Sequence, residues 1–99
     1  MALPQTPETD LLFESILSLK SVDECYRYFE DLCTVREVQS ISQRLAVACM
    51  LADGQSYQNT IAQTGASSAT ISRVKRCLDY GAGGYKTVLE RLPKKEDAS

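Results

Sequence analysis

The chain has 99 residues, of which 43% are hydrophobic and 24% are charged, and its formal net charge is −2. This length fits one small domain, and the composition is ordinary for a globular protein. The sequence contains no apolar run long enough to span a membrane, and its first ten residues lack the features of a signal peptide. We therefore expect a cytoplasmic protein with no membrane partner.

The N-terminal part of the chain is expected to begin with a flexible arm at residues 1–9, ahead of a domain at 10–92. Thr6-Pro7-Glu8 is typical of a helix start, because threonine caps the helix and proline fits its first turn. Leu12, Ile16 and Leu19 recur at helical spacing and predict the first helix.

Two further helix starts are marked by capping boxes, SVDE at 21–24 and TVRE at 34–37. In this motif Ser or Thr and Glu bond to backbone N–H groups at the helix start. The second helix carries an apolar stripe: Val22, Cys25, Tyr26, Phe29, Leu32 and Cys33. The third helix is expected to stop at Gly54. Its apolar stripe consists of Val38, Ile41, Leu45, Ala48 and Cys49.

Three shorter helices are predicted in the C-terminal half. The fourth covers residues 57–64 with Ser56 as its cap, and the fifth begins after Ser67 and ends near Tyr80. Three glycines in GAGG, at 81–84, end the fifth helix, and a sixth follows at 85–92. Residues 93–99 are expected to form a disordered tail. No alternating strand pattern is present, so the sequence predicts an all-α fold.

The most informative segment is YQNTIAQTGASSATISRVKRCL, at residues 57–78, which contains no acidic residue. Two short helices joined at Gly65, the second rich in small polar residues, are typical of a helix-turn-helix that places its second helix in a DNA major groove. The predicted DNA-binding residues are Gln58, Ser67, Ser68, Ala69, Thr70, Ser72, Arg73, Lys75 and Arg76. The alternative is an ordinary exposed helix face. For Lys75, a phosphate contact and a merely solvated side chain remain equally open.

The charge distribution reconciles DNA binding with a negative net charge. Residues 1–40 hold eight acidic and three basic side chains, whereas residues 54–78 hold three basic side chains and no acidic one. Ionic screening limits the field that a phosphate backbone experiences to about 8–10 Å, so the local patch matters more than the total charge.

The first two helices also carry apolar residues outside a single stripe, among them Leu11, Phe13 and Leu17 in the first. A small helix that is apolar most of the way round needs partners on both sides. A second copy of the chain would supply them, so we expect a homodimer.

Enzymatic activity is the least favoured function. The sequence has no histidine and no CxxC pair, its four cysteines lack a visible activating partner, and GAGG follows a helix instead of opening one. We therefore expect no catalysis, metal or cofactor. The main alternative to a DNA-binding regulator is a helical dimeric protein–protein interaction module, which would have no need for the acid-free stretch.

Two segments closely resemble the tryptophan-repressor superfamily: SQRLAVACMLADG at residues 42–54 and GASSATISRVKRCL at residues 65–78. ECYRYFEDLCT, TGASSATISR and DYGAGGY are similar to its YerC/YecD branch. The resemblance covers residues 10–92 and implies a six-helix Trp-repressor-like fold in an intertwined homodimer. It also implies binding to operator-like double-stranded DNA and regulation of transcription, as a repressor.

The resemblance further implies a ligand pocket between Arg44 and Arg73, which match two arginines that hold the corepressor in the tryptophan repressor. The repressor's glycine after the second arginine is replaced here by Val74, which should encroach on the pocket. We therefore expect that L-tryptophan is not a corepressor and leave the effector open. Arg44 could instead contact phosphate or pair with Glu37 or Asp79.

The resemblance has one further departure, in the fourth helix. A small residue is typical four positions before the turn glycine, where the two helices of the motif cross, but Ile61 stands there and Thr60 precedes it. These residues predict looser packing or a shifted angle between the two helices.

Overall fold

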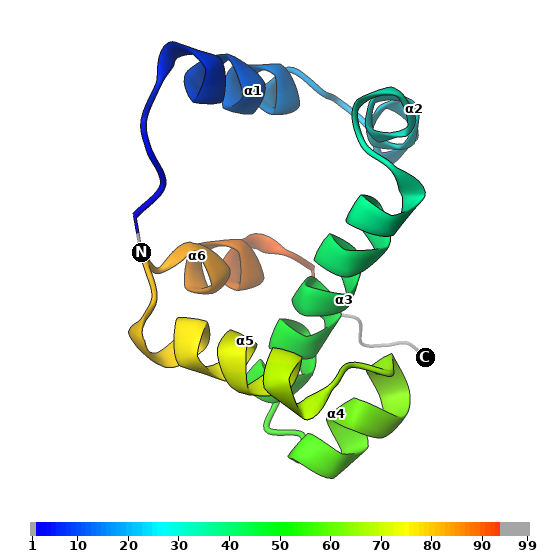
Figure 1. The fold of residues 1–99 in the computed structure, drawn as a ribbon, viewed down its shortest axis with the longest axis vertical. Helices are drawn as coiled ribbons and strands as arrows, with labels where there is room; N and C mark the ends of the chain where they lie inside the picture. Colours follow the sequence, from blue (N-terminus) through cyan, green and yellow to red (C-terminus); the bar gives the residue numbers. More distant parts are fainter. Residues whose placement is uncertain (1, 94–99) are drawn as a thin grey trace. The chain divides into compact units, whose positions relative to one another are not determined.

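A computed structural model of the protein describes residues 2–93, which form six α-helices and no strand (Figure 1). The helices are α1 (Pro7–Leu17), α2 (Val22–Leu32), α3 (Val35–Ala52), α4 (Tyr57–Thr64), α5 (Ser68–Tyr80) and α6 (Gly84–Arg91). The all-α prediction is confirmed. α1 begins at Pro7, within the range expected for the arm at 1–9. The division of the chain into that arm and a domain at 10–92 stays a prediction. All of the expected tail except Pro93 lies outside the described residues.

Side-chain caps begin the helices where the sequence predicts them. The hydroxyl oxygens of Thr6 and Ser21 each accept a hydrogen bond of 3.1 Å from a backbone N–H three residues later. The Thr34 box is complete, since Thr34 N–H also donates to Glu37 Oε1 at 2.8 Å. The Ser21 box differs from expectation in one bond, because Glu24 Oε1 accepts from the backbone N–H of Lys20 instead of Ser21.

The chain divides into two compact units between Val38 and Gln39, inside α3. The first unit contains α1 and α2, and none of its described residues is fully buried. The Ser15 and Tyr28 hydroxyl groups join these two helices at 2.6 Å. The predicted stripe of α2 is therefore wrong in part. Tyr28, outside that stripe, is half-buried, whereas Tyr26, within it, is 69% exposed.

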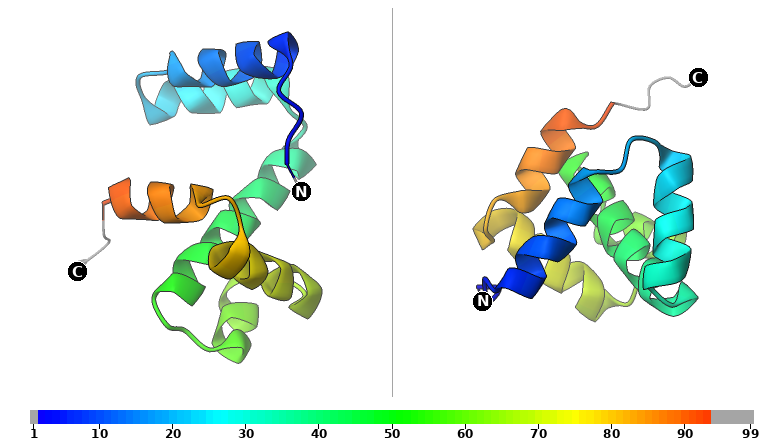
Figure 2. Two further views of the ribbon diagram at one scale, coloured as in Figure 1. Left: turned by 90° about the vertical axis from the view of Figure 1, so that its left-hand side faces the viewer. Right: turned by 90° about the horizontal axis from the view of Figure 1, so that it is seen from above.

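The second unit has a fully buried apolar cluster. Val47 and Ala48 from α3 pack with Ala66, Ile71 and Val74, and three half-buried side chains surround them: Leu51, Leu78 and Tyr85. In this unit α4 and α5 lie beside the C-terminal half of α3, and α6 follows α5 (Figure 2). The predicted apolar face of α3 needs correction. Ile41 and Leu45 are exposed, and the buried side is centred on Val47, which the stripe did not include.

Within residues 2–93, no helix has both the length and the apolar character that crossing a membrane requires. The same residues contain no group of three or more His, Cys, Asp or Glu side chains arranged to hold a metal ion. The four cysteines are free thiols.

Candidate nucleic-acid interface

The turn between α4 and α5 adopts the geometry that its glycine permits. Gly65 lies in the left-handed region at φ +72°, where L-residues with a side chain are disfavoured, and its N–H closes α4 on Ile61 O at 2.9 Å. Ser67 Oγ then caps α5 by accepting from Thr70 N–H at 3.1 Å. α4, this turn and α5 together form the predicted helix-turn-helix.

Thr60 and Ile61, which precede the turn glycine in α4, differ in burial. Thr60 is fully buried, while Ile61 is 39% exposed. The hydroxyl of Thr60 donates to Ser56 O at 2.8 Å, which satisfies its buried polar atom. The looser packing or shifted angle expected between the two helices stays a prediction.

α5 has one buried and one exposed face. Ile71 and Val74 are buried on the core side of the helix. Eight of the nine predicted DNA-binding residues are exposed: Gln58, Ser67, Ser68, Ala69, Ser72, Arg73, Lys75 and Arg76. Thr70 is half-buried. Gln58 lies in the first turn of α4, and the others lie on α5 or at its cap.

The charged side chains of α5 have different environments. Lys75 Nζ lies 3.4 Å from Asp79 Oδ1, one turn further along the helix, so Lys75 is neither unpaired nor purely solvated. Arg73 and Arg76 take part in no ion pair within the described part of the chain, where the other ion pair joins Arg27 to Asp23. Two guanidinium groups on the exposed side of the helix are therefore available to an anionic partner.

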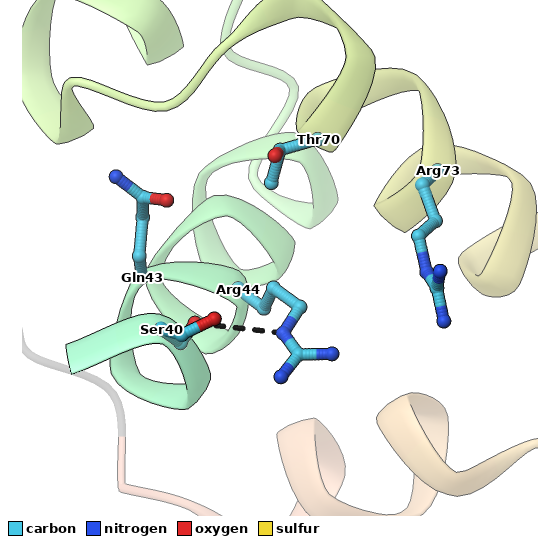
Figure 3. Close-up of a pocket in the computed structure, with 5 residues that line it drawn as sticks. All are labelled: Ser40, Gln43, Arg44, Thr70 and Arg73. Carbon is cyan, nitrogen blue, oxygen red and sulfur yellow. Dashed lines mark hydrogen bonds between the residues drawn. The ribbon is translucent and has the colours of Figure 1, made fainter. Parts of the chain in front are cut away.

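Arg44 and Arg73 line one pocket of about 250 Å³ in the second unit, together with Ser40, Gln43 and Thr70. Figure 3 shows the guanidinium groups of Arg44 and Arg73 on one side of this space and Gln43 and Thr70 on the other. Arg44 Nε donates to Ser40 O at 3.5 Å. The predicted pairing of Arg44 with Glu37 or Asp79 is not found among the described residues.

The prediction that Val74 encroaches on the pocket is wrong, because Val74 is a core residue. Its side chain is 1% exposed and packs in the apolar cluster of the second unit, and it does not line the pocket. All five lining residues are polar or charged.

Sequence reasoning missed Ser40 and Gln43. Gln43 Nε2 donates to Thr64 O at 3.2 Å and so connects α3 to the C-terminal end of α4. One signal could have identified it: Gln43 lies four and eight residues before Val47 and Leu51, so it is a polar residue on the buried face of α3.

A family model described as Trp repressor protein matches residues 7–93. The chain belongs to the Trp repressor family. It is 56% identical over 92 residues to YerC, an uncharacterized protein of Bacillus subtilis (strain 168), and the match covers 93% of this chain and 88% of that relative.

Two solved structures resemble this member of the Trp repressor family over most of its length, and both are 49% identical to it. One is a candidate Trp repressor from Staphylococcus aureus, with a TM-score of 0.85 over 88% of this chain and 87% of the other. The second is a TrpR-like protein from Eubacterium eligens ATCC 27750, with a TM-score of 0.84 over 91% and 96% of the two chains. The predicted Trp-repressor-like fold of the YerC type is thereby confirmed.

Proposed function

We propose that the protein is a sequence-specific DNA-binding transcriptional regulator, a repressor, that uses the helix-turn-helix at about residues 57–80. The observation that carries this proposal is the division of α5 into two faces. Ile71 and Val74 are buried against the core, while the opposite face is exposed, small, polar and basic. Membership of a regulator family supports the same conclusion.

The exposed residues have distinct roles in this proposal. The small side chains at the start of α5, Ser68 and Ala69, allow the helix to approach base edges closely. The N–H groups of its first turn favour a nearby phosphate. Arg73 and Arg76 reach for guanine or phosphate, and Gln58 contacts DNA from α4. Lys75, already paired with Asp79, contributes less.

We further propose that the protein acts as a homodimer on a two-fold symmetric site, with α1, α2 and the first part of α3 supplying the contact between copies. Large apolar side chains are exposed on all three elements, for example Leu17 on α1, Val22 on α2 and Val35 on α3. None of the residues described in the first unit is fully buried, so a second copy would complete its core.

The proposed location is the cytoplasm, where a regulator meets DNA and where free thiols persist. No enzymatic role is proposed. The pocket at Arg44 and Arg73 could receive an effector, but its polar lining does not suit the indole of L-tryptophan. The alternative is a protein–protein interaction module without DNA binding. This alternative does not explain why α5 has an exposed basic face.

The proposal is tested by selecting bound sequences from random duplex DNA and measuring their affinity as a function of salt concentration. We expect a two-fold symmetric motif and an affinity that falls steeply with salt, because Lys and Arg contacts release counterions. A salt-independent contact with another protein, and no enriched duplex, would favour the interaction module.

Sedimentation equilibrium tests the dimer separately. Leu17→Glu should weaken association by at least about tenfold, since it would bury a charge in an apolar contact. Gln5→Glu, which adds the same charge outside α1, is the control. A stable, folded wild-type monomer at low micromolar concentration would contradict the dimer.

A further inference from the structure

We propose that Gln43 is a positioning residue that sets the orientation of the helix-turn-helix on α3. Its side-chain amide donates to the backbone carbonyl of Thr64, the last residue of α4, at 3.2 Å. The structural part of this proposal is independent of ligand and DNA, whereas its consequence for DNA recognition rests on the proposed function.

The Thr64 carbonyl is a group that α4 cannot satisfy by itself. The last four carbonyl groups of a helix have no partner inside that helix. The turn satisfies one of them by Gly65 N–H donating to Ile61 O, and Ala66 N–H goes to the Thr64 hydroxyl. Gln43 supplies a donor to the Thr64 carbonyl from a different helix, so this bond joins α3 to the turn of the motif.

The Gln43–Thr64 hydrogen bond is a second attachment between α3 and the helix-turn-helix, in addition to an apolar contact. Val47 and Ala48 of α3 pack with Ile71 and Val74 of α5, which prevents separation but gives little directional constraint. Gln43 lies four residues before Val47, or about 6 Å along the helix axis on the same face. Two attachments separated along α3 resist a pivoting motion that one apolar contact would allow.

No other polar side-chain bond joins α3 to α4 or α5 within residues 2–93. Gln43 also lines the pocket that lies between α3 and the start of α5 (Figure 3). Close packing is therefore missing at this level of α3. At Gln43, the hydrogen bond to Thr64 holds the helix-turn-helix on α3, whereas one turn later, at Val47, apolar packing does so.

The direct experiment compares Gln43→Met, which keeps the side-chain length and removes the donor, with Gln43→Lys, which restores one. Gln39→Met is the matched control, since Gln39 is exposed and lies one turn earlier on α3. Backbone N–H residual dipolar couplings measure the orientation of α4 and α5 relative to residues 39–52. The carbonyl ¹³C shift of Thr64 reports the bond itself.

In Gln43→Met we expect the couplings of α4 and α5 to fit one common rotation away from the wild-type orientation, with the Thr64 carbonyl shift changed. Gln43→Lys should restore both, and Gln39→Met should alter neither. Wild-type couplings in a folded Gln43→Met protein would overturn the proposal. Loss of internal order in α4 and α5 would also overturn it, because the bond would then maintain folding and not orientation.

DNA binding provides the functional measurement. Loss of one hydrogen bond should reduce affinity for the selected duplex by roughly threefold to tenfold. Affinity for unrelated duplexes should change less, because phosphate contacts tolerate a changed angle better than base contacts do. Equal losses on all duplexes would overturn the link to recognition. A wild-type protein that binds no duplex would overturn the proposed function while leaving the dipolar-coupling result standing.

Discussion

The two units of this chain differ in how completely they bury their own apolar side chains. The second unit closes around Val47, Ala48, Ala66, Ile71 and Val74. In the first unit, by contrast, no residue that the structure describes is fully buried, and Leu17 is 83% exposed. The difference indicates a division of labour: one unit is packed within the chain and displays a polar face, while the other presents apolar surface that a partner could cover.

The largest expected effect comes from the core of the second unit. Ile71→Ala should lower the free energy of unfolding by about 2–5 kcal/mol, because it removes buried methyl groups and leaves a cavity. Urea denaturation at fixed protein concentration measures the loss. Leu3→Ala is the control in the first unit and should cost less than about 1 kcal/mol, because that side chain is exposed and lies outside the helices proposed to contact a second copy. Equal losses at both positions would contradict the comparison.

The next effect concerns the polar face that the second unit displays. Arg73→Ala should weaken binding to the selected duplex by about 1–3 kcal/mol if the guanidinium contacts a guanine. If Arg73 contacts phosphate instead, the loss should be similar on all sequences. Fluorescence anisotropy with selected and scrambled duplexes distinguishes the two. Lys86→Ala removes the same charge from exposed α6 and is the control. No loss on either duplex would show that α5 does not contact DNA.

A smaller effect is expected at the turn of the helix-turn-helix. Gly65→Ala should cost about 1–2 kcal/mol in thermal unfolding, because φ +72° is a left-handed conformation that an L-residue with a side chain disfavours even where the added Cβ meets open space. Gly65→Asn should cost less, since asparagine tolerates this conformation better. The comparison position is Gly84, where an added Cβ also meets open space but the backbone is helical, so that Gly84→Ala should be neutral or slightly stabilising. Equal costs for alanine at both glycines would contradict the role of the turn.

Local signals in the sequence were sufficient for much of the fold. The caps and the turn depend on hydrogen bonds between residues only three or four positions apart, so short motifs are enough to predict them. The structure confirms them for Thr34 with Glu37, for Ser67 and for Gly65. The exposed and buried faces of α5 also follow from helical periodicity.

What the sequence did not reveal depends on contacts between distant residues. The bond from Gln43 to Thr64 spans 21 residues, and no periodic pattern encodes such a partner. The burial of Thr60 instead of Ile61 in α4 also depends on such contacts, because neighbouring residues lie about 100° apart around the helix axis. In α2, Tyr28 becomes half-buried through its bond to Ser15, which a hydrophobic stripe does not register.

The last prediction is that adding L-tryptophan has no effect, because L-tryptophan should not bind to the protein. The two arginines that favour the opposite view, Arg44 and Arg73, do lie on one pocket. An indole, however, gains affinity by entering a mainly apolar space, and the larger part of this pocket's wall is polar. Enlarging it toward the core would displace Val74, whose burial contributes about 1.5–3 kcal/mol. Calorimetric titration with about 1 mM tryptophan, a concentration that half-saturates even a millimolar complex, should therefore give no binding heat. A saturable isotherm of about micromolar affinity would contradict this, and it would mean that the core around Val74 rearranges to admit the ring.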